Sequence, residues 1–233
     1  MIKLKLAGLK KTSLIDYPKL ISAVVFTRGC NFSCGYCHNS QLIDNKAAEE
    51  NMPEDIFFDF LSKRQQLLDG VVISGGEPTL QPDLKDFIKR IKREYNLKIK
   101  LDSNGSNQSI IKELIKANLI DYLAVDIKQS WDNYSNLSSE AIIPELKKTF
   151  SLILNSELEY EFRTTVVPGW HDKKEIEKIA KTIQGADRYY IQNFKAVNTL
   201  DPVLKERRSF SPTELQSFKE AAEKYLRVVK IRN

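Results

Sequence analysis

Cysteine is scarce in this sequence, and long apolar runs are absent. Only three cysteines occur in 233 residues, and all of them lie between positions 30 and 37. An odd, tightly clustered set is a poor disulfide framework and indicates a metal site in a reducing compartment. No apolar run approaches the roughly 20 residues that cross a bilayer. Residues 1–18 contain lysines without the apolar stretch of a signal peptide. These absences predict a cytoplasmic protein with no membrane partner.

Histidine and dense basic stretches are scarce as well. The chain has two histidines and a net charge of +5, and its lysines are spread among acidic residues. This mixture is typical of solvated helix surfaces. We expect no nucleic-acid partner, because such a surface would concentrate its charge in a stripe with interleaved aromatic residues. Hydrophobic residues make up 42% of the chain, so residues 1–233 are predicted to form a single domain around one core.

Strand and helix patterns alternate along the chain. Short β-branched or alternating runs predict strands, and apolar residues at helical spacing predict helices. The expected strands are 21–27, 71–74, 97–102, 122–127, 160–167, 188–194 and a short last one at 228–231. The expected helices are 53–68, 82–94, 108–117, 142–154, one that ends near 183 and one that begins at 211.

This alternation implies a parallel sheet of the α/β class. The expected strands are too few for a full eight-stranded barrel, and periodicity leaves both an open partial barrel and a doubly wound sheet. Either fold binds its ligands at the C-terminal ends of the strands. Polar residues that directly follow a strand are therefore the candidates for a site.

The three cysteines follow the first expected strand with the spacing Cys-x3-Cys-x2-Cys. Thiolates at this spacing can surround one soft metal centre, and three of them leave one iron of a four-iron cubane without a protein ligand. The alternative is a zinc site completed by His38, and hence a zinc-stabilised binding module. His38 directly follows Cys37, and neighbouring side chains usually point apart, so the loop favours the iron–sulfur cluster.

With Tyr36 between the second and third cysteines, the loop reads Cys-x3-Cys-x-aromatic-Cys. It resembles the signature of the radical S-adenosylmethionine superfamily. This resemblance implies a partial (β/α)6 barrel, a [4Fe–4S] cluster on Cys30, Cys34 and Cys37, and S-adenosylmethionine as the second cofactor. It also implies no catalytic residue beyond the cluster, because the cofactors supply the difficult chemistry.

Polar groups follow the later strands at the same end. Residues 75–78 (Gly-Gly-Glu-Pro) follow the second strand, residues 102–104 (Asp-Ser-Asn) the third, and Asp126 with Lys128 the fourth. Taken singly they predict a tight turn, an Asn-Gly turn and a local ion pair. Arg163 lies on the polar face of the fifth strand. Taken together they predict one site at the C-terminal face.

The resemblance implies a role for each group. Residues 75–78 would contact the amino group of the methionine part, residues 102–104 the ribose or a nearby monovalent cation, and Arg163 the carboxylate. Asp126 would also lie near the cation, while Asn193 stands where some related activases have a histidine near the adenine. The residues so implied in cofactor binding are Tyr36, His38, Gly75, Gly76, Glu77, Pro78, Asp102, Ser103, Asn104, Asp126, Lys128, Arg163 and Asn193.

The whole chain resembles the activating proteins of anaerobic ribonucleoside-triphosphate reductase. Residues 13–18 (Ser-Leu-Ile-Asp-Tyr-Pro), 37–39 (Cys-His-Asn) and 167–170 (Val-Pro-Gly-Trp) carry this resemblance. It implies a glycyl radical enzyme as partner, a glycine hydrogen as target, and an external one-electron reductant such as flavodoxin or ferredoxin. Two related alternatives are a pyruvate formate-lyase activase and a small-molecule enzyme such as 7-carboxy-7-deazaguanine synthase, which takes a pterin and Mg²⁺.

Overall fold

The computed structural model describes residues 4–44, 51–137 and 140–232. The chain divides into two compact units, which are described one at a time. Unit 1 comprises residues 1–31, 41–103 and 109–123, and unit 2 comprises residues 32–40, 104–108 and 124–233. The expectation of a single domain stays a prediction. None of the helices in the described ranges is both long enough and apolar enough to cross a membrane.

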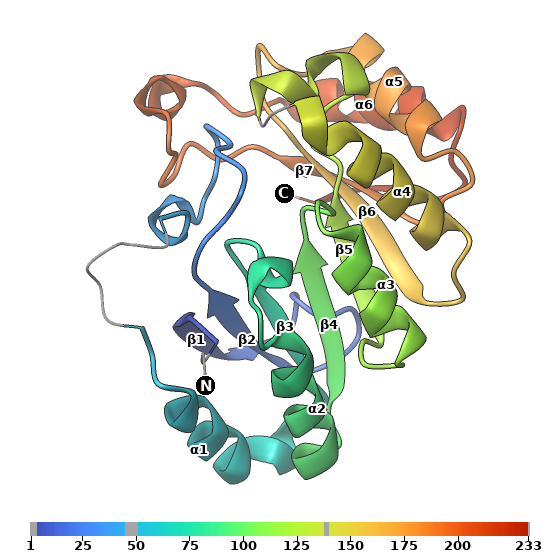
Figure 1. Cartoon of the computed structure of the whole chain (residues 1–233). Helices are drawn as coiled ribbons and strands as arrows, with labels where there is room; N and C mark the ends of the chain where they lie inside the picture. Colours follow the sequence, from blue (N-terminus) through green and yellow to red (C-terminus); the bar gives the residue numbers. More distant parts are fainter. Residues whose placement is uncertain (1–3, 45–50, 138–139, 233) are drawn as a thin grey trace. The chain divides into compact units, whose positions relative to one another are not determined.

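Unit 1 is built on four strands whose pairing follows the chain order. They are β1 (Leu6–Ser13), β2 (Ser22–Thr27), β3 (Gly70–Gly75) and β4 (Lys98–Ser103). The pairs β2–β3 and β3–β4 are parallel, while β1 pairs antiparallel with β2. The helices are α1 (Glu54–Arg64), α2 (Leu84–Tyr95) and α3 (Gln108–Lys116) (Figure 1). Helix α3 begins at the unit boundary, which lies after residue 108.

The core of unit 1 follows from its apolar runs. Residues 23–25 and 71–73 are fully buried along β2 and β3, as expected for parallel strands covered on both faces. Helix α2 buries one apolar stripe and ends at Asn96, whose left-handed φ of 54° is a common helix termination. The expected strands and helices of this unit are confirmed to within a few residues at their ends.

Unit 2 holds the parallel strands β6 (Glu159–Val166), β7 (Tyr189–Asn193) and β8 (Val229–Arg232). Strand β5 (Tyr122–Asp126) contains the boundary between the units, after residue 123. The helices are α4 (Ile143–Leu154), α5 (Lys173–Thr182) and α6 (Pro212–Glu223). Two of these helices have side-chain caps: the side chain of Asp172 accepts from the Glu175 N–H, and Ser211 forms a capping box with Glu214.

The structure corrects the expectation of a purely parallel sheet that begins near residue 21. The described residues contain eight strands, and the first of them, β1, is antiparallel. Its sequence, Leu-Ala-Gly-Leu-Lys-Lys-Thr-Ser, lacks a regular alternation, and residues 10–12 are exposed. An exposed strand at a sheet edge needs few apolar residues and is often charged, so its pattern is weak.

The remaining helical segments are short 3-10 turns. Gln65–Leu67 falls within the helix expected over 53–68, and the other turns connect the main elements. Their bounds are Ser40–Leu42, Gln65–Leu67, Pro78–Leu80, Trp131–Asn136, Glu140–Ile142 and Pro202–Glu206.

Candidate functional site

The cysteine loop leaves unit 1 directly after β2. Cys30 belongs to unit 1, and its N–H donates to the carbonyl oxygen of Ile43 at 3.2 Å. Cys34 and Cys37 belong to unit 2, where the Cys37 N–H donates to the Cys34 carbonyl at 3.0 Å and closes a turn. All three thiols are free of disulfides. Within each unit, a backbone hydrogen bond thus holds the chain at the predicted ligands.

The donor set suits an iron–sulfur cluster. Burial raises the pKa of the Cys34 thiol, and the ammonium of Lys128 acts in the opposite direction. A metal that binds thiolates displaces the proton and removes this penalty. Within the described ranges, no three His, Cys, Asp or Glu side chains are grouped around a position for one metal ion. A cubane imposes a different geometry, because each thiolate binds its own iron.

Tight packing supports the middle of the loop within unit 2. A Cβ atom on Gly35 would lie 3.1 Å from the Asp201 side chain and 3.3 Å from Trp170. The buried ring of Tyr36 meets Trp170 edge-on, with ring centroids 5.5 Å apart. Exposed His38 has its Nε2 2.9 Å from the carbonyl oxygen of Lys195, so this nitrogen donates. Trp170, part of the predicted Val-Pro-Gly-Trp segment, therefore packs on the aromatic residue of the cysteine loop.

The two glycines after β3 are required by close backbone packing in unit 1. Gly75 has a φ of 119°, and a Cβ atom there would overlap the backbone of Thr27. A Cβ atom on Gly76 would overlap the carbonyl group of Gly29. The Gly76 N–H donates to Thr27 and the Glu77 N–H to Gly29, at 2.9 and 2.8 Å. The glycine turn is therefore held against the chain segment that leads to Cys30.

Glu77 is fully buried, and its carboxylate joins two strand ends. Its Oε1 atom accepts from the N–H and hydroxyl of Thr79 at 3.1 and 2.6 Å, and from the hydroxyl of Ser103 at 2.8 Å. Ser103 ends β4, whereas Glu77 follows β3. This acid therefore positions its neighbours, and Pro78 begins the 3-10 turn that follows it.

Asp102 is paired with a lysine that the sequence reasoning missed. The ammonium of Lys100 lies 2.6 Å from Asp102 Oδ1, and the two side chains are 3% and 17% exposed. They are two residues apart on β4 and so share a face of the sheet. A lysine within a strand of a charged sequence looks ordinary, and its burial became visible only in the structure.

Asn104 makes the predicted Asn-Gly turn in unit 2. Its Oδ1 accepts from the Ser106 N–H at 2.9 Å, and Gly105 has a φ of 79°. The carbonyl of Gly105 in turn accepts from the hydroxyl of Thr149 at 2.7 Å. The turn is anchored to α4, which fixes the position of Asn104.

Asp126, Lys128 and Arg163 form a charged cluster in unit 2. Asp126 binds Arg163 Nε at 2.9 Å and Lys128 Nζ at 3.3 Å. Burial alone would raise the pKa of Asp126, but the two cations hold it below its usual range. Burial would lower the pKa of Lys128, yet Asp126 raises it well above normal. The expected Asp126–Lys128 ion pair thus also includes Arg163.

The backbone beside this cluster is held by two residues that the sequence reasoning did not assign. The hydroxyl of Tyr134 accepts from the Lys128 N–H at 3.0 Å. His171 Nδ1 accepts from the Val167 N–H at 3.0 Å, and its Nε2 lies 2.8 Å from the Lys128 carbonyl, so Nε2 carries the proton. Burial lowers the pKa of His171. The position of His171 directly after the Val-Pro-Gly-Trp segment was the available signal.

Two further groups complete the polar contacts of unit 2. The amide of Asn193 is engaged with the backbone of Phe210, donating at 2.9 Å and accepting at 3.1 Å. Glu161, whose side chain is fully buried, binds Arg232 through both oxygens at 2.7 and 2.8 Å. The Arg232 guanidinium also stacks on the ring of Tyr190, 3.4 Å from its centroid. These contacts fix the orientation of the Asn193 and Glu161 side chains.

A cavity of about 280 Å³ opens beside Cys30 in unit 1. The side chain of Gln81 lies at its wall, where it accepts from the Lys5 N–H and donates to the Arg28 carbonyl at 3.1 and 2.7 Å. The cavity gives one predicted cluster ligand an open neighbourhood with basic residues. Its lining residues are Lys5, Arg28, Gly29, Cys30, Leu80, Gln81 and Pro82.

Comparison with known proteins finds one matching family model and relatives with similar descriptions. The family model described as the radical SAM superfamily matches residues 24–192. A protein of Methanocaldococcus jannaschii described as a glycyl-radical enzyme activating enzyme is 38% identical over 99% of this chain and 97% of its own. The pyruvate formate-lyase-activating enzyme of Clostridium pasteurianum is 27% identical over 86% of this chain and 82% of its own.

Solved structures bear on the fold. Streptococcus suis SuiB bound to S-adenosylmethionine superposes with a TM-score of 0.66 at 16% identity, over 88% of this chain and 48% of SuiB. A domain of a Bacteroides vulgatus pyruvate-formate lyase-activating enzyme superposes with a TM-score of 0.54 at 19% identity, over 70% of this chain and 99% of that domain. At this identity the likeness concerns the fold alone, and it confirms the expected partial α/β barrel.

Proposed function

Because the chain belongs to the radical S-adenosylmethionine superfamily and, within it, to the glycyl-radical enzyme activating enzymes, we propose that it activates anaerobic ribonucleoside-triphosphate reductase by removing a glycine Cα hydrogen. Membership implies a [4Fe–4S] cluster and S-adenosylmethionine as cofactors. The observation that carries the proposal is the set of three cysteines directly after β2, none of them in a disulfide, inside the matched region.

Cys30, Cys34 and Cys37 would hold the cluster, with one iron left for the cofactor. When bound, the cluster supplies the electron that splits S-adenosylmethionine into methionine and a 5′-deoxyadenosyl radical. The protein residues position the cofactor, and none of them is required to transfer a proton. Because the turn that joins Cys34 to Cys37 is closed by a backbone hydrogen bond, these two ligands need little rearrangement.

Lys128 and Arg163 are proposed to bind the carboxylate of the methionine part. Both cations contact Asp126, and ammonium and guanidinium groups form charge-assisted hydrogen bonds with carboxylates. Tyr134 and His171 hold the backbone of Lys128 from two sides. The anion site is therefore rigid before the cofactor arrives, which reduces the entropy lost on binding.

Gly75 and Gly76 are proposed to expose their backbone to the amino group of the cofactor, and Asp102 and Ser103 to bind its ribose. The absence of a Cβ atom at the glycines permits a close approach. The hydroxyl of Ser103 is oriented by its bond to Glu77, so its oxygen lone pairs have a defined direction. Tyr36, His38, Pro78, Asn104 and Asn193 would line the cofactor through backbone or packing contacts.

The identity of the partner enzyme is the most specific part of the proposal. Anaerobic ribonucleoside-triphosphate reductase is favoured by the resemblance of residues 13–18, 37–39 and 167–170 to its activating proteins. The similarity to the C. pasteurianum enzyme supports pyruvate formate-lyase as a second candidate. An external one-electron donor of the flavodoxin or ferredoxin class would reduce the cluster, and the free thiols suit a reducing cytoplasm.

The experiment starts with anaerobic reconstitution and metal analysis. Four irons and sulfides per chain with formation of 5′-deoxyadenosine are expected, whereas one zinc and no iron would refute the radical chemistry. Electron spin resonance with each of the two candidate enzymes then identifies the partner by its glycyl radical. Cys34→Ala is expected to abolish 5′-deoxyadenosine, while Ser33→Ala, exposed on the same loop, should retain it. Cofactor cleavage without a radical in either enzyme would refute the proposed partners.

A further inference from the structure

Lys100 is a buried charged residue of unit 1 whose partners at the same level on β3 and β2 are apolar. It lies in the middle of β4, where it is paired in register with Val72 of β3, which is paired with Val24 of β2. Paired residues of parallel strands project from the same face of the sheet. Lys100 is 2% exposed, and both valines are buried. Its ammonium has therefore lost most of its hydration, which is costly unless another charge replaces the water.

The carboxylate of Asp102 compensates for the lost hydration of the Lys100 ammonium. The Lys100 Nζ–Asp102 Oδ1 distance of 2.6 Å is at the short end of the range for charge-assisted hydrogen bonds. Other lysine pairs of unit 1 are much more exposed; in the pair of Lys85 with Glu113 the side chains are 41% and 55% exposed. The Lys100–Asp102 pair thus differs from the surface pairs in burial as well as in length.

Stability alone does not account for a lysine at this position. A buried ion pair is often no more stable than apolar residues of similar volume, and methionine has nearly the length of the lysine stem. The pair does have a direct effect on Asp102, because it fixes one carboxylate oxygen and balances its charge. The next residue, Ser103, is fixed by Glu77. Two successive residues at the end of β4 are thus held by separate buried partners.

We propose that Lys100 is a positioning residue whose ammonium acts as a built-in counter-cation for Asp102. This inference rests on the proposed function, in which Asp102 binds the ribose of S-adenosylmethionine. A carboxylate in a partly buried site needs a positive charge nearby, either from the protein or from a cation taken from solution. Because Lys100 already supplies it, cofactor binding at Asp102 does not require an added monovalent cation.

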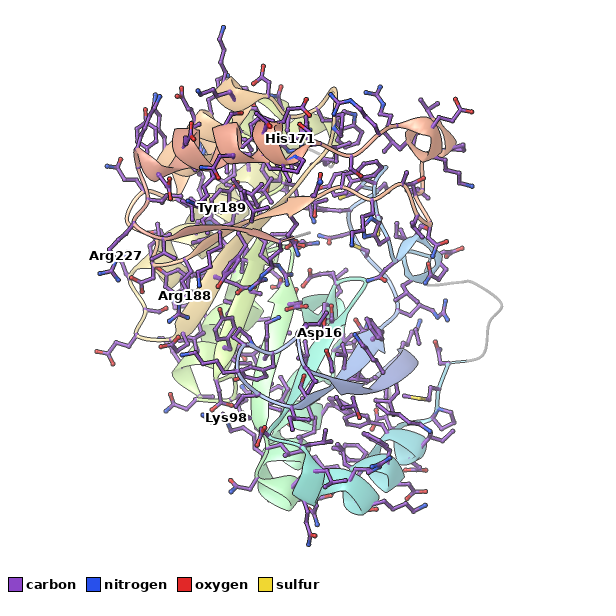
Figure 2. All side chains as sticks on the ribbon, turned by 180° about the vertical axis from the view of Figure 1, so that it is seen from behind. Asp16, Lys98, His171, Arg188, Tyr189 and Arg227 are labelled. Carbon is purple, nitrogen blue, oxygen red and sulfur yellow. The ribbon has the colours of Figure 1, made fainter. Side chains whose placement is uncertain are left out.

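The test compares Lys100→Met with Lys98→Met in the reconstituted protein. Lys98 is exposed at the start of the same strand (Figure 2) and makes a matched control. The dissociation constant of S-adenosylmethionine is measured in choline chloride, sodium chloride and potassium chloride at equal ionic strength. The wild type and Lys98→Met should bind equally in all three salts. Lys100→Met should bind about tenfold more weakly in choline chloride, the worth of one charge-assisted hydrogen bond.

Sodium or potassium should restore part of the lost affinity in Lys100→Met, because a small cation can occupy the place of the ammonium and choline cannot. Lys100→Arg keeps the charge and should show no salt preference. The thermal unfolding midpoint of Lys100→Met should fall, because Asp102 is left in a partly buried position without its partner. The salt dependence of the dissociation constant, measured below that midpoint, separates a loss of positioning from a loss of folding.

Three results would overturn the inference. One is a Lys100→Met protein with wild-type affinity in every salt, which would show that the ion pair has no effect on cofactor binding. Another is a wild type that itself requires sodium or potassium. The third is a Lys100→Met protein that does not fold, which would assign the ammonium to stability. A wild type that binds no S-adenosylmethionine in any salt refutes the proposed function itself, and the inference with it.

Discussion

Acidification below about pH 6.5 is expected to destabilise unit 2 through His171. The imidazole is buried and neutral, with Nδ1 accepting from Val167 and Nε2 donating to Lys128. Protonation would turn Nδ1 into a donor that faces the Val167 N–H. Burial is the main cause that lowers the pKa of His171, and the carboxylates of Glu175 and Asp172 raise it only in part.

The sign follows from proton binding. In the unfolded chain this histidine titrates near its ordinary pKa of about 6.5, whereas in the folded protein it titrates lower. Between these two values the unfolded state binds more protons, so stability falls as pH falls. Each unit by which the pKa is lowered corresponds to about 1.4 kcal/mol. The contribution is fully present above pH 6.5 and is lost below the pKa of the folded protein.

The variant His171→Phe isolates this effect. It leaves the Val167 N–H and the Lys128 carbonyl without the imidazole, at about 1–3 kcal/mol for each buried group. The expected loss is therefore about 2–6 kcal/mol at pH 7.5. His171→Asn retains an oxygen that can accept from Val167 and should lose less. Neither variant has the titrating group.

Urea denaturation of the wild type and both variants between pH 8 and pH 5 measures the prediction. The difference in free energy of unfolding between wild type and His171→Phe should be largest above pH 6.5 and should shrink as the pH falls. Groups that titrate equally in both proteins cancel in this difference. Parallel curves over the whole range would refute the assignment of a neutral, buried imidazole.

The remaining predictions concern buried charge and backbone packing. Arg232→Met removes the bidentate partner of the buried Glu161 carboxylate and should lower the free energy of unfolding by about 2–3 kcal/mol. The control Arg188→Met removes one partner of a more exposed ion pair and should change this free energy by less than about 1 kcal/mol. Equal losses for the two variants in urea denaturation would contradict this prediction. Gly76→Ala should lower the free energy of unfolding by more than about 2 kcal/mol, because the added Cβ would overlap a backbone carbonyl. In the control Gly8→Ala the added Cβ meets no atom within 4 Å. Similar thermal unfolding midpoints for the two variants would refute the packing argument.

The alternation of strands and helices was predictable because buried parallel strands are continuous apolar runs. Residues 71–73 are such a run, and β3 extends one residue beyond the prediction on each side. Strand β1 was not predictable, since an exposed edge places little constraint on its side chains and residues 10–12 face solvent. Its antiparallel pairing depends on the hairpin to β2, which carries no two-residue turn signature.

The residues of the candidate site could be predicted from the sequence, but the contacts that each of them makes could not. The Asp126–Lys128 pair was visible because residues two apart on a strand share a face, whereas Arg163 joins it from the neighbouring strand only in three dimensions. Lys100 and His171 were missed because burial, which gives each its role, is a property of the folded chain. Asn193 was selected by position, and its amide is bound to the backbone of Phe210.

The contacts of Glu77 have a consequence for protein engineering. A short Gly-Gly-Glu-Pro string looks portable, as though it could be transplanted into another loop to create a cofactor site. Its acid, however, is oriented by Thr79 and by Ser103, and Ser103 lies on the next strand of the sheet. The smallest transferable module is therefore a pair of adjacent strand ends with both hydroxyls in place. A graft of the four residues alone would bury the glutamate carboxylate without the hydroxyl groups that donate hydrogen bonds to it.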